Sequence, residues 1–232
     1  MSERAGQLDQ VRVDGDDLSD VLVEVEASFG ATLPHDLVHV GTVGELFDEV
    51  LKVRKPDGLG DRCDTAMAFY RLRRILKGYG LSARAGPTTA LAGQGLPSPR
   101  TIRRILSGDL RFAAPGIVIS RTGCILSSII VASAIGLALV TWSWDWLPLW
   151  LLVLPALALD RGGWEGDWKT LGSLSRAIAA RNVATLVRDG ARNRESDWWR
   201  SFARLIAETA FDERGQAVDY RQIGRATKFV FT

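Results

Sequence analysis

The stretch from Thr122 to Leu159 constrains the fold of this chain more than any other, because it is strongly apolar and carries a single charged residue, Asp145. The twenty residues 122–141 contain no charge. A helix of that length, rising about 1.5 Å per residue, reaches across a hydrocarbon layer of about 30 Å. The second apolar run, residues 146–159, is only fourteen residues long, so it crosses fully only if it tilts little or the bilayer thins. The sequence therefore predicts a two-helix transmembrane hairpin over residues 117–161.

Basic residues flank this hairpin, and its turn contains none: Arg103, Arg104, Arg111 and Arg121 precede it, and Arg161 and Lys169 follow it. The positive-inside bias then places both ends of the hairpin on the cytoplasmic side. We expect an inner-membrane protein with both termini in the cytoplasm. The tryptophans of the turn either lie at the far membrane interface or pack between the two helices.

The net charge of +2 hides a strong asymmetry along the chain. Residues 1–50 hold 2 basic and 12 acidic residues, and residues 51–121 hold 14 basic and 4 acidic residues. An acidic region followed by a basic one indicates either that the two meet or that the basic one faces anionic lipid. We divide the chain into an acidic module, a basic helical region, the hairpin and a C-terminal helical region, with expected bounds 1–55, 56–116, 117–161 and 162–232.

The acidic module has the pattern of short helices. Its first apolar residues recur at helical spacing and end before Gly30, a helix stop: Leu18, Val21, Leu22, Val25 and Phe29. Pro34 begins a short turn or helix, and Thr42 with Glu45 forms a T-x-x-E capping box for a helix through Leu51. These signals predict an all-α fold.

The run DGDDLSDVLVEVEASFGATLPHDLVHVGTVGELFDEVL, residues 14–51, resembles the second half of an acyl carrier protein. It resembles still more closely a divergent bacterial branch of acyl-carrier-like domains in which G-D-D-L replaces the carrier motif D-S-L. The resemblance places the carrier's modified serine on Gly15, which has no hydroxyl, and so implies that no phosphopantetheine is attached there. Ser19 is the nearest hydroxyl and the one weak candidate for such a cofactor; otherwise it is a solvated helix residue.

A further helix is predicted from about Arg62 to Lys77, with Asp61 as its N-cap. Its C-terminal half, where the helix dipole favours cations, carries Arg71, Arg73, Arg74 and Lys77. These residues either face lipid phosphates or an acidic partner, or are the solvated charges of an ordinary amphipathic helix. Motif signatures of nucleic-acid-binding folds are absent, so we expect no nucleic-acid partner.

Two signals follow the hairpin. The helix start T-L-G-S-L at residues 170–174 echoes T-V-G-E-L at residues 42–46, which indicates an internal repeat. A last helix, carrying Trp198 and Phe202, and the later run I-G-R-A-T-K-F-V at residues 223–230 resemble the first helix and loop of a carrier protein, which the acidic module lacks. A three-helix fragment would expose a large apolar face to water, at a free-energy cost of roughly 25 cal/mol per Å². We therefore predict that residues 198–208 complete the acidic module, within the chain or from a neighbouring chain in a homo-oligomer.

No pattern in the sequence predicts catalysis. The G-x-S-x-G nucleophile elbow, the G-x-x-x-x-G-K-[ST] phosphate loop and the G-x-G-x-x-G dinucleotide fingerprint are all absent. His35 and His39 have a spacing that suits zinc on a helix, but Pro34 and Gly41 bound the segment and no cysteine lies nearby. We expect a non-enzymatic protein without a metal or a cofactor.

These patterns together predict a membrane-anchored, non-enzymatic acyl-carrier-like interaction module. Its acidic helix would bind a basic protein partner through Asp16, Asp17, Asp20 and Glu24. The alternative is a working acyl carrier that uses Ser19, or an accessory subunit of a membrane-lipid enzyme. A small transport component, based on the hairpin and Asp145, is a third hypothesis.

Overall fold

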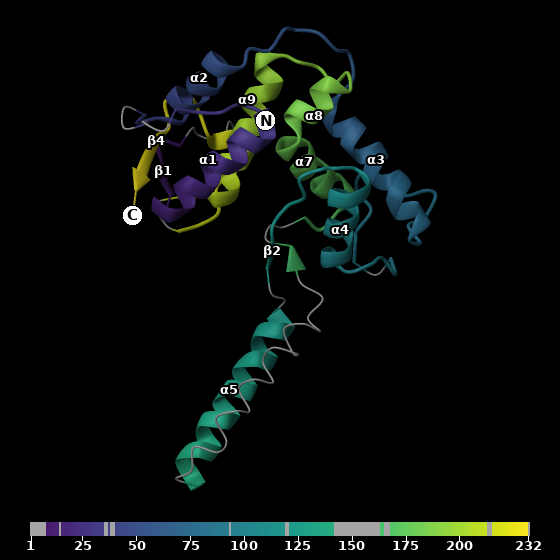
Figure 1. The fold of residues 1–232 in the computed structure, drawn as a ribbon, viewed down its shortest axis with the longest axis vertical. Helices are drawn as coiled ribbons and strands as arrows, with labels where there is room; N and C mark the ends of the chain where they lie inside the picture. The colour runs from purple at the N-terminus through teal and green to yellow at the C-terminus, as the bar shows by residue number, and fades with distance from the viewer. Residues whose placement is uncertain are drawn as a thin grey trace, which may run out of the picture.

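The computed structural model describes residues 8–13, 15–34, 37, 40–92, 94–118, 121–141, 163–164, 168–212 and 215–231. Within them, buried side chains form two hydrophobic cores. Both cores lie in the body of the molecule, and one long helix points away from that body (Figure 1).

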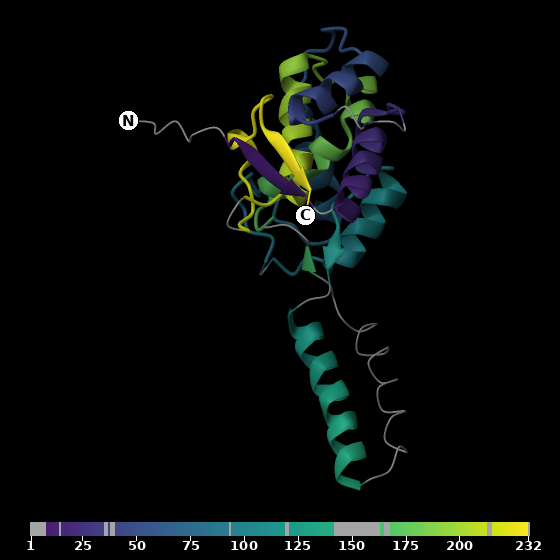
Figure 2. The same ribbon diagram turned by 90° about the vertical axis from the view of Figure 1, so that its left-hand side faces the viewer.

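The first core is built from the two ends of the chain. Its elements are strand β1 (Gln10–Val13), helices α1 (Gly15–Phe29), α2 (Val43–Val53) and α9 (Glu195–Thr209), and strand β4 (Lys228–Phe231). The two strands pair in parallel, with Val11 opposite Phe229 and Val13 opposite Phe231. Figure 2 shows these strands side by side against the helices.

Helix α9 supplies the aromatic centre of this core. The Trp198 ring lies 5.3 Å from the Phe29 ring of α1, measured between centroids, and the Phe202 ring lies 5.2 Å from the Phe47 ring of α2. All four side chains are buried. The structure thus confirms that residues 198–208 complete the acidic module, and the completing helix comes from the same chain.

The second core is formed by the middle of the chain. Its helices are α3 (Asp64–Gly78), α4 (Pro99–Asp109), α7 (Leu171–Arg181) and α8 (Val183–Arg188). Helix α4 begins with a serine N-cap, since Ser98 Oγ accepts a hydrogen bond from the backbone N–H of Thr101. Helix α3 begins later than expected, with Cys63 rather than Asp61 at its N-cap position.

The two helix starts that echo each other in sequence, those of α2 and α7, are docked in the same way, one in each core. Each has a capping box. In the first turn of α2 the backbone N–H of Gly44 donates to the carbonyl oxygen of Arg225 at 2.9 Å, and in α7 that of Gly172 donates to the carbonyl oxygen of Pro87 at 2.8 Å. The predicted repeat of one helix start is confirmed.

The loops that receive these helix starts also share a hydrogen-bond pattern. In the first core Thr227 Oγ1 accepts from the backbone N–H of Gly224 at 2.9 Å, and in the second core Thr89 Oγ1 accepts from that of Gly86 at 2.8 Å. The carbonyl oxygen of each threonine accepts from the first residue of the docked helix at 2.9 Å. The repeat therefore includes the loop as well as the helix.

Alanine at Gly44, and equally at Gly172, is expected to lower the free energy of unfolding by about 1 to 3 kcal/mol. A Cβ atom would lie 2.5 Å from the carbonyl oxygen of Arg225 at the first site and 2.7 Å from that of Pro87 at the second. Urea unfolding followed by circular dichroism measures the loss.

Gly78→Ala is the matched control, because a Cβ there meets nothing within 4 Å. Alanine has the better helix propensity, so this variant should be neutral or slightly more stable. A loss at one of the two docked glycines and none at the other would contradict their equivalence.

The predicted first span of the hairpin is a helix, α5 (Arg121–Thr141), and it extends away from both cores (Figures 1 and 2). At its base, strands β2 (Ile117–Val118) and β3 (Gly163–Trp164) form an antiparallel pair. Large apolar side chains of α5 are exposed: Ile125, Ile129, Val131, Ile135 and Leu139.

No helix within the described residues is both long enough and apolar enough to cross a membrane. The predicted transmembrane hairpin over residues 117–161, the membrane anchoring and the inner-membrane localisation with cytoplasmic termini are therefore wrong. A crossing needs about 20 consecutive, predominantly apolar residues. The second apolar run, residues 146–159, is shorter than that and lies outside the described residues.

The all-α class also needs correction, because the described residues contain two pairs of short strands. The molecule is mainly helical, with strand pairing at the chain ends and at the base of α5. Both pairs join segments that are far apart in the sequence, so no local hairpin-turn signal predicts them.

Candidate functional site

Helix α1 divides the predicted acidic residues between two environments. Asp20 is exposed, whereas Glu24 is half-buried and its Oε1 lies 2.5 Å from Nε of Arg181 on α7. Asp16 and Asp17 lie in the first turn of α1, but their side chains are outside the described part of the structure. Glu24 is therefore engaged inside the protein and does not belong to an exposed acidic surface.

The outward face of α1 combines acid and apolar character. Ser19 and Asp20 are exposed, and Val23 is 64% exposed although it is a large apolar residue. Ala27 continues the same face one turn later, and Asp16 precedes Asp20 by one turn. We call the exposed residues Asp20, Val23 and Ala27 the outer face of α1.

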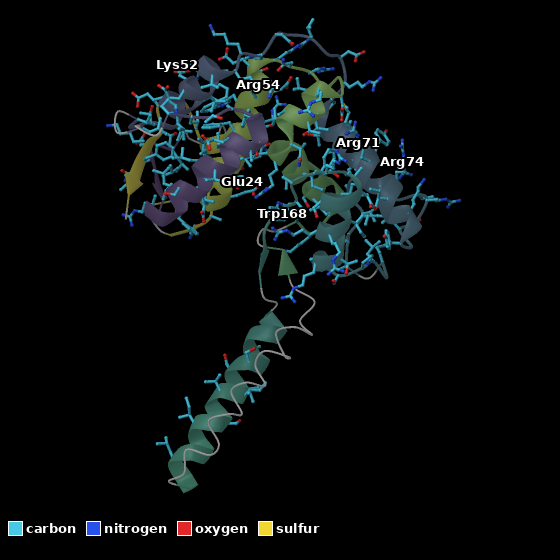
Figure 3. The ribbon with its side chains drawn as sticks, in the orientation of Figure 1. Glu24, Lys52, Arg54, Arg71, Arg74 and Trp168 are labelled. Carbon is cyan, nitrogen blue, oxygen red and sulfur yellow. The ribbon has the colours of Figure 1, made fainter. Side chains whose placement is uncertain are left out.

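The four predicted basic residues of α3 are likewise separated. Arg71 pairs with Asp189 at 2.7 Å, and its guanidinium carbon lies 5.5 Å from the centre of the Phe112 ring, so both of its contacts are with the second core and its surroundings. The Nη2 of Arg73 donates to the carbonyl oxygen of Ala83 at 2.5 Å. The other two, Arg74 and Lys77, are exposed and make no ion pair with any described residue. Figure 3 shows Arg71 and Arg74 on α3, well apart from Glu24 on α1.

A buried arginine that sequence reasoning missed links the two cores. The side chain of Arg181 is 6% exposed, and it pairs with Glu24 of α1 and with Glu208 of α9. Its guanidinium also lies 5.5 Å from the centre of the Trp168 ring. The available signal was a lone charge within the apolar sequence A-I-A-A-R at the end of α7. The acidic module is thus contacted by a cation from α7, in the C-terminal region, and Glu24 does not pair with the basic residues of α3.

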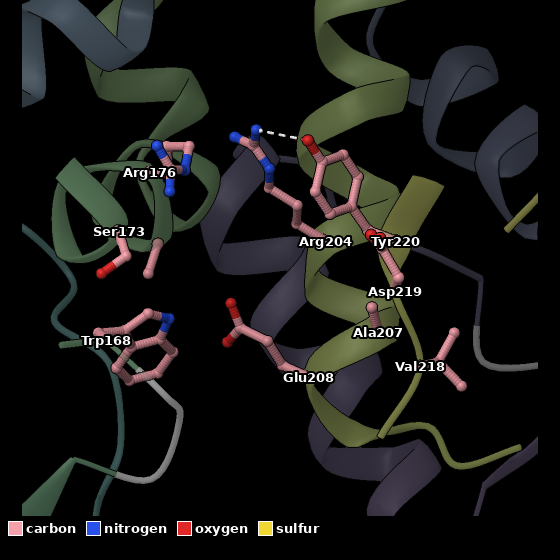
Figure 4. A pocket seen from close by; sticks show the side chains of 10 residues that line it. Trp168, Ser173, Arg176, Arg204, Ala207, Glu208, Val218, Asp219 and Tyr220 are labelled. Atoms are coloured by element: carbon pink, nitrogen blue, oxygen red, sulfur yellow. Dashed lines mark hydrogen bonds between the residues drawn. The ribbon is translucent and has the colours of Figure 1, made fainter. Parts of the chain in front are cut away.

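Beside this arginine, a pocket of about 550 Å³ lies between α7, α9 and the 3-10 helix η2 (Tyr220–Gln222). Figure 4 shows Trp168 and Ser173 on one side, and Arg204 and Tyr220 on the other. The lining contains two arginines, Arg176 and Arg204, and the carboxylates of Glu208 and Asp219. Because both signs of charge are present, the pocket does not by itself select one class of ligand.

The pKa of Tyr220 is perturbed in this pocket. Its hydroxyl accepts hydrogen bonds from Arg204 at 3.2 Å and from Arg221 at 3.4 Å, and the Arg204 guanidinium lies 4.5 Å over the ring. Burial raises the pKa of Tyr220, but the two hydrogen bonds and the two positive charges outweigh it and hold the pKa below its ordinary value. The two arginines thus stabilise the phenolate form of Tyr220 relative to that of a free tyrosine.

The Arg204→Gln variant is expected to raise the pKa of Tyr220, because it removes one hydrogen bond and one positive charge. Absorbance at about 295 nm, from about pH 8 to about pH 12, follows tyrosine ionisation around its ordinary value of about 10. Subtracting the titration of Tyr220→Phe isolates this residue. Arg200→Gln, on the same helix but paired with Asp197, should leave the midpoint where it is; an unmoved midpoint in Arg204→Gln would contradict the assignment.

The remaining predicted residues have simple positions. Gly15 begins α1, and Ser19 lies exposed on the same helix. His35 and His39 lie outside the described residues.

Compared with protein-family models, with curated proteins and with solved structures, the chain gives no match. The resemblance to acyl carrier proteins accordingly stays a prediction, based on the sequence runs quoted above.

Proposed function

We propose that this protein is a non-enzymatic interaction module that binds a basic protein partner through the outer face of α1. The observation that carries the proposal is the exposure of Val23, 64%, beside the exposed carboxylate of Asp20. Protein interfaces commonly combine an apolar centre with a charged rim. Val23 would supply the centre, and the acids at 16 and 20 the rim.

Charge supports a basic partner. Residues 1–50 carry 12 acidic and 2 basic residues, so this end of the chain attracts cationic surfaces and speeds their approach. Glu24 is excluded from the contact because Arg181 already neutralises it. The proposal therefore keeps Asp16 and Asp20 from the predicted set and adds Val23, whereas the role predicted for Asp17 stays a prediction.

The resemblance to acyl carriers agrees with a docking role. The resemblance puts Gly15 at the position of the modified serine, and a glycine has no hydroxyl to carry a phosphopantetheine. A carrier-like surface without its attachment point retains the means to bind a partner but not to deliver a cargo.

Affinity capture with the full chain tests the proposal. The immobilised wild-type protein should retain one or more basic proteins from a lysate of the source organism, and salt should release them because the contact is electrostatic. The double variant Asp20→Lys, Val23→Asn should lose them. Both side chains are exposed, so the circular dichroism spectrum should not change.

Asp109→Lys is the matched control, since it reverses an exposed acid at the end of α4. It should retain the same proteins as the wild type. Equal capture by Asp20→Lys, Val23→Asn and by the wild type would overturn the assignment to α1.

A working acyl carrier is the second candidate, and the exposure of Ser19 favours it. Co-expression with a phosphopantetheinyl transferase, followed by intact-mass measurement, separates the two. A prosthetic-group adduct that is present on the wild type and absent from Ser19→Ala would overturn the carrier-without-cargo proposal.

A further inference from the structure

A second pocket, also of about 550 Å³, lies between α3, α7 and the loop of residues 84–87. Figure 1 shows α3 and α7 packed side by side in the second core. Arg176 is the one lining residue that this pocket shares with the pocket of Figure 4. The outer face of α1 belongs to the other core, so this pocket is independent of the proposed function.

Three arginines line the pocket: Arg73 from α3, Arg84 from the loop and Arg176 from α7. None of its described lining residues is an aspartate or a glutamate. Arg84 and Arg176 are exposed, and their side chains make no ion pair or hydrogen bond with any described residue. Within the described part of the chain, the pocket is therefore a concentration of positive charge without a counter-charge in its lining.

Arg73 is held in place and still has a free donor. Its Nη2 is bound to the carbonyl oxygen of Ala83, which orients the guanidinium. Its Nε is buried and has no hydrogen-bond partner among the described residues. Buried polar atoms in folded proteins are nearly always satisfied. An anionic oxygen at this position would satisfy the donor and balance the charge.

Apart from the arginines, Thr65 and Ser175, the described lining of the pocket is mainly apolar and aromatic. Phe69 and Ala66 of α3, with Ala85 and Pro87 of the loop, contribute to its lining. Tyr70 also lines it and is 61% exposed, with its ring edge-on to Phe69 at 5.4 Å between centroids. An inorganic anion would leave this surface unused, so the ligand is expected to carry an apolar group as well.

We propose that this pocket binds a phosphate monoester of an apolar, preferably aromatic, alcohol. The phosphate would lie between Arg73, Arg84 and Arg176, since guanidinium groups bind phosphate oxygens in a bidentate manner. The apolar group would lie against Phe69 and Tyr70. The volume of the pocket falls within the range of roughly 300 to 1,000 Å³ that is usual for small-molecule sites.

Isothermal titration calorimetry of the full chain with 1-naphthyl phosphate at low ionic strength tests the proposal. This probe should bind at least about tenfold more tightly than either inorganic phosphate or 1-naphthol, because each of these supplies only half of the interaction. Arg84→Gln and Arg176→Gln should each weaken the binding about five- to tenfold. Both side chains are exposed and neither has a partner among the described residues, so both variants should fold.

Arg74→Gln is the matched control, because Arg74 is exposed on the same helix and does not line the pocket. Its affinity for 1-naphthyl phosphate should equal that of the wild type. The proposal is overturned if the probe does not bind, if inorganic phosphate binds as tightly, or if Arg74→Gln weakens binding as much as Arg84→Gln does.

Discussion

Replacing Phe202 by alanine is expected to lower the free energy of unfolding by about 3 to 5 kcal/mol. The side chain is fully buried in α9, and its ring lies 6.2 Å from Phe29, 5.2 Å from Phe47 and 6.0 Å from Trp199. The variant leaves a cavity where three helices meet, and α1 and α2 lose the surface that completes their core. Urea unfolding of the full chain, followed by circular dichroism, measures the loss.

Leu59→Ala is the control for this experiment, because Leu59 is also a large apolar residue but is 69% exposed. It should change the free energy of unfolding by less than about 0.5 kcal/mol. A loss of less than about 1 kcal/mol for Phe202→Ala would mean that α9 is not part of the first core.

Replacing Arg181 by methionine is expected to lower the free energy of unfolding by a similar amount, about 3 to 5 kcal/mol, because it removes a buried positive charge. Methionine keeps most of the apolar stem but leaves the carboxylates of Glu24 and Glu208 facing each other without their shared cation. It also removes the stacking on Trp168. The same unfolding measurement applies, at neutral pH and low salt.

The exposed pair of Arg200 and Asp197, 3.4 Å apart, provides the comparison. Arg200→Met should cost about 0 to 1 kcal/mol, as exposed ion pairs usually do. Adding Glu24→Gln and Glu208→Gln to Arg181→Met should restore part of the lost stability, because the repulsion is then removed. Equal losses for Arg181→Met and Arg200→Met would show that the buried arginine does not join the cores.

Features with local signals were predictable from the sequence. Gly30 ends α1 with a φ of 60°, and the capping box of Thr42 and Glu45 begins α2. Ser98 and Pro99 begin α4. Each of these signals lies within a few residues of the structure that it determines, so neither the rest of the chain nor a partner is needed to interpret it.

Features determined by distant contacts were not predictable in the same way. Helix α3 begins after Asp61 because the backbone of Arg62 pairs with Ala191, and its carbonyl oxygen accepts from the backbone N–H of Arg192 at 2.8 Å. This pairing keeps the segment extended and overrides a good N-cap residue.

The residues of the candidate site were also hard to predict from the sequence, because distant contacts determine their environments. The carboxylates of Asp20 and Glu24 are equivalent in sequence terms, and only the position of Arg181 on a remote helix separates an exposed acid from an engaged one. The pocket between α3 and α7 depends on three arginines from three segments. Of these, only Arg73 was a predicted site residue, and it was assigned there to an open basic surface.

The pairing of β1 with β4 has a consequence for synthesis. Ribosomes add about 5 to 20 residues per second, so roughly 10 to 40 s separate the appearance of Val13 from that of its partner Phe231. For most of that interval the apolar side chains of α1 and α2 have no α9 to cover them, and they are candidates for chaperone binding. The elements of the second core are complete once α8 has been made, before α9 exists. The middle of this protein is therefore expected to fold before its beginning.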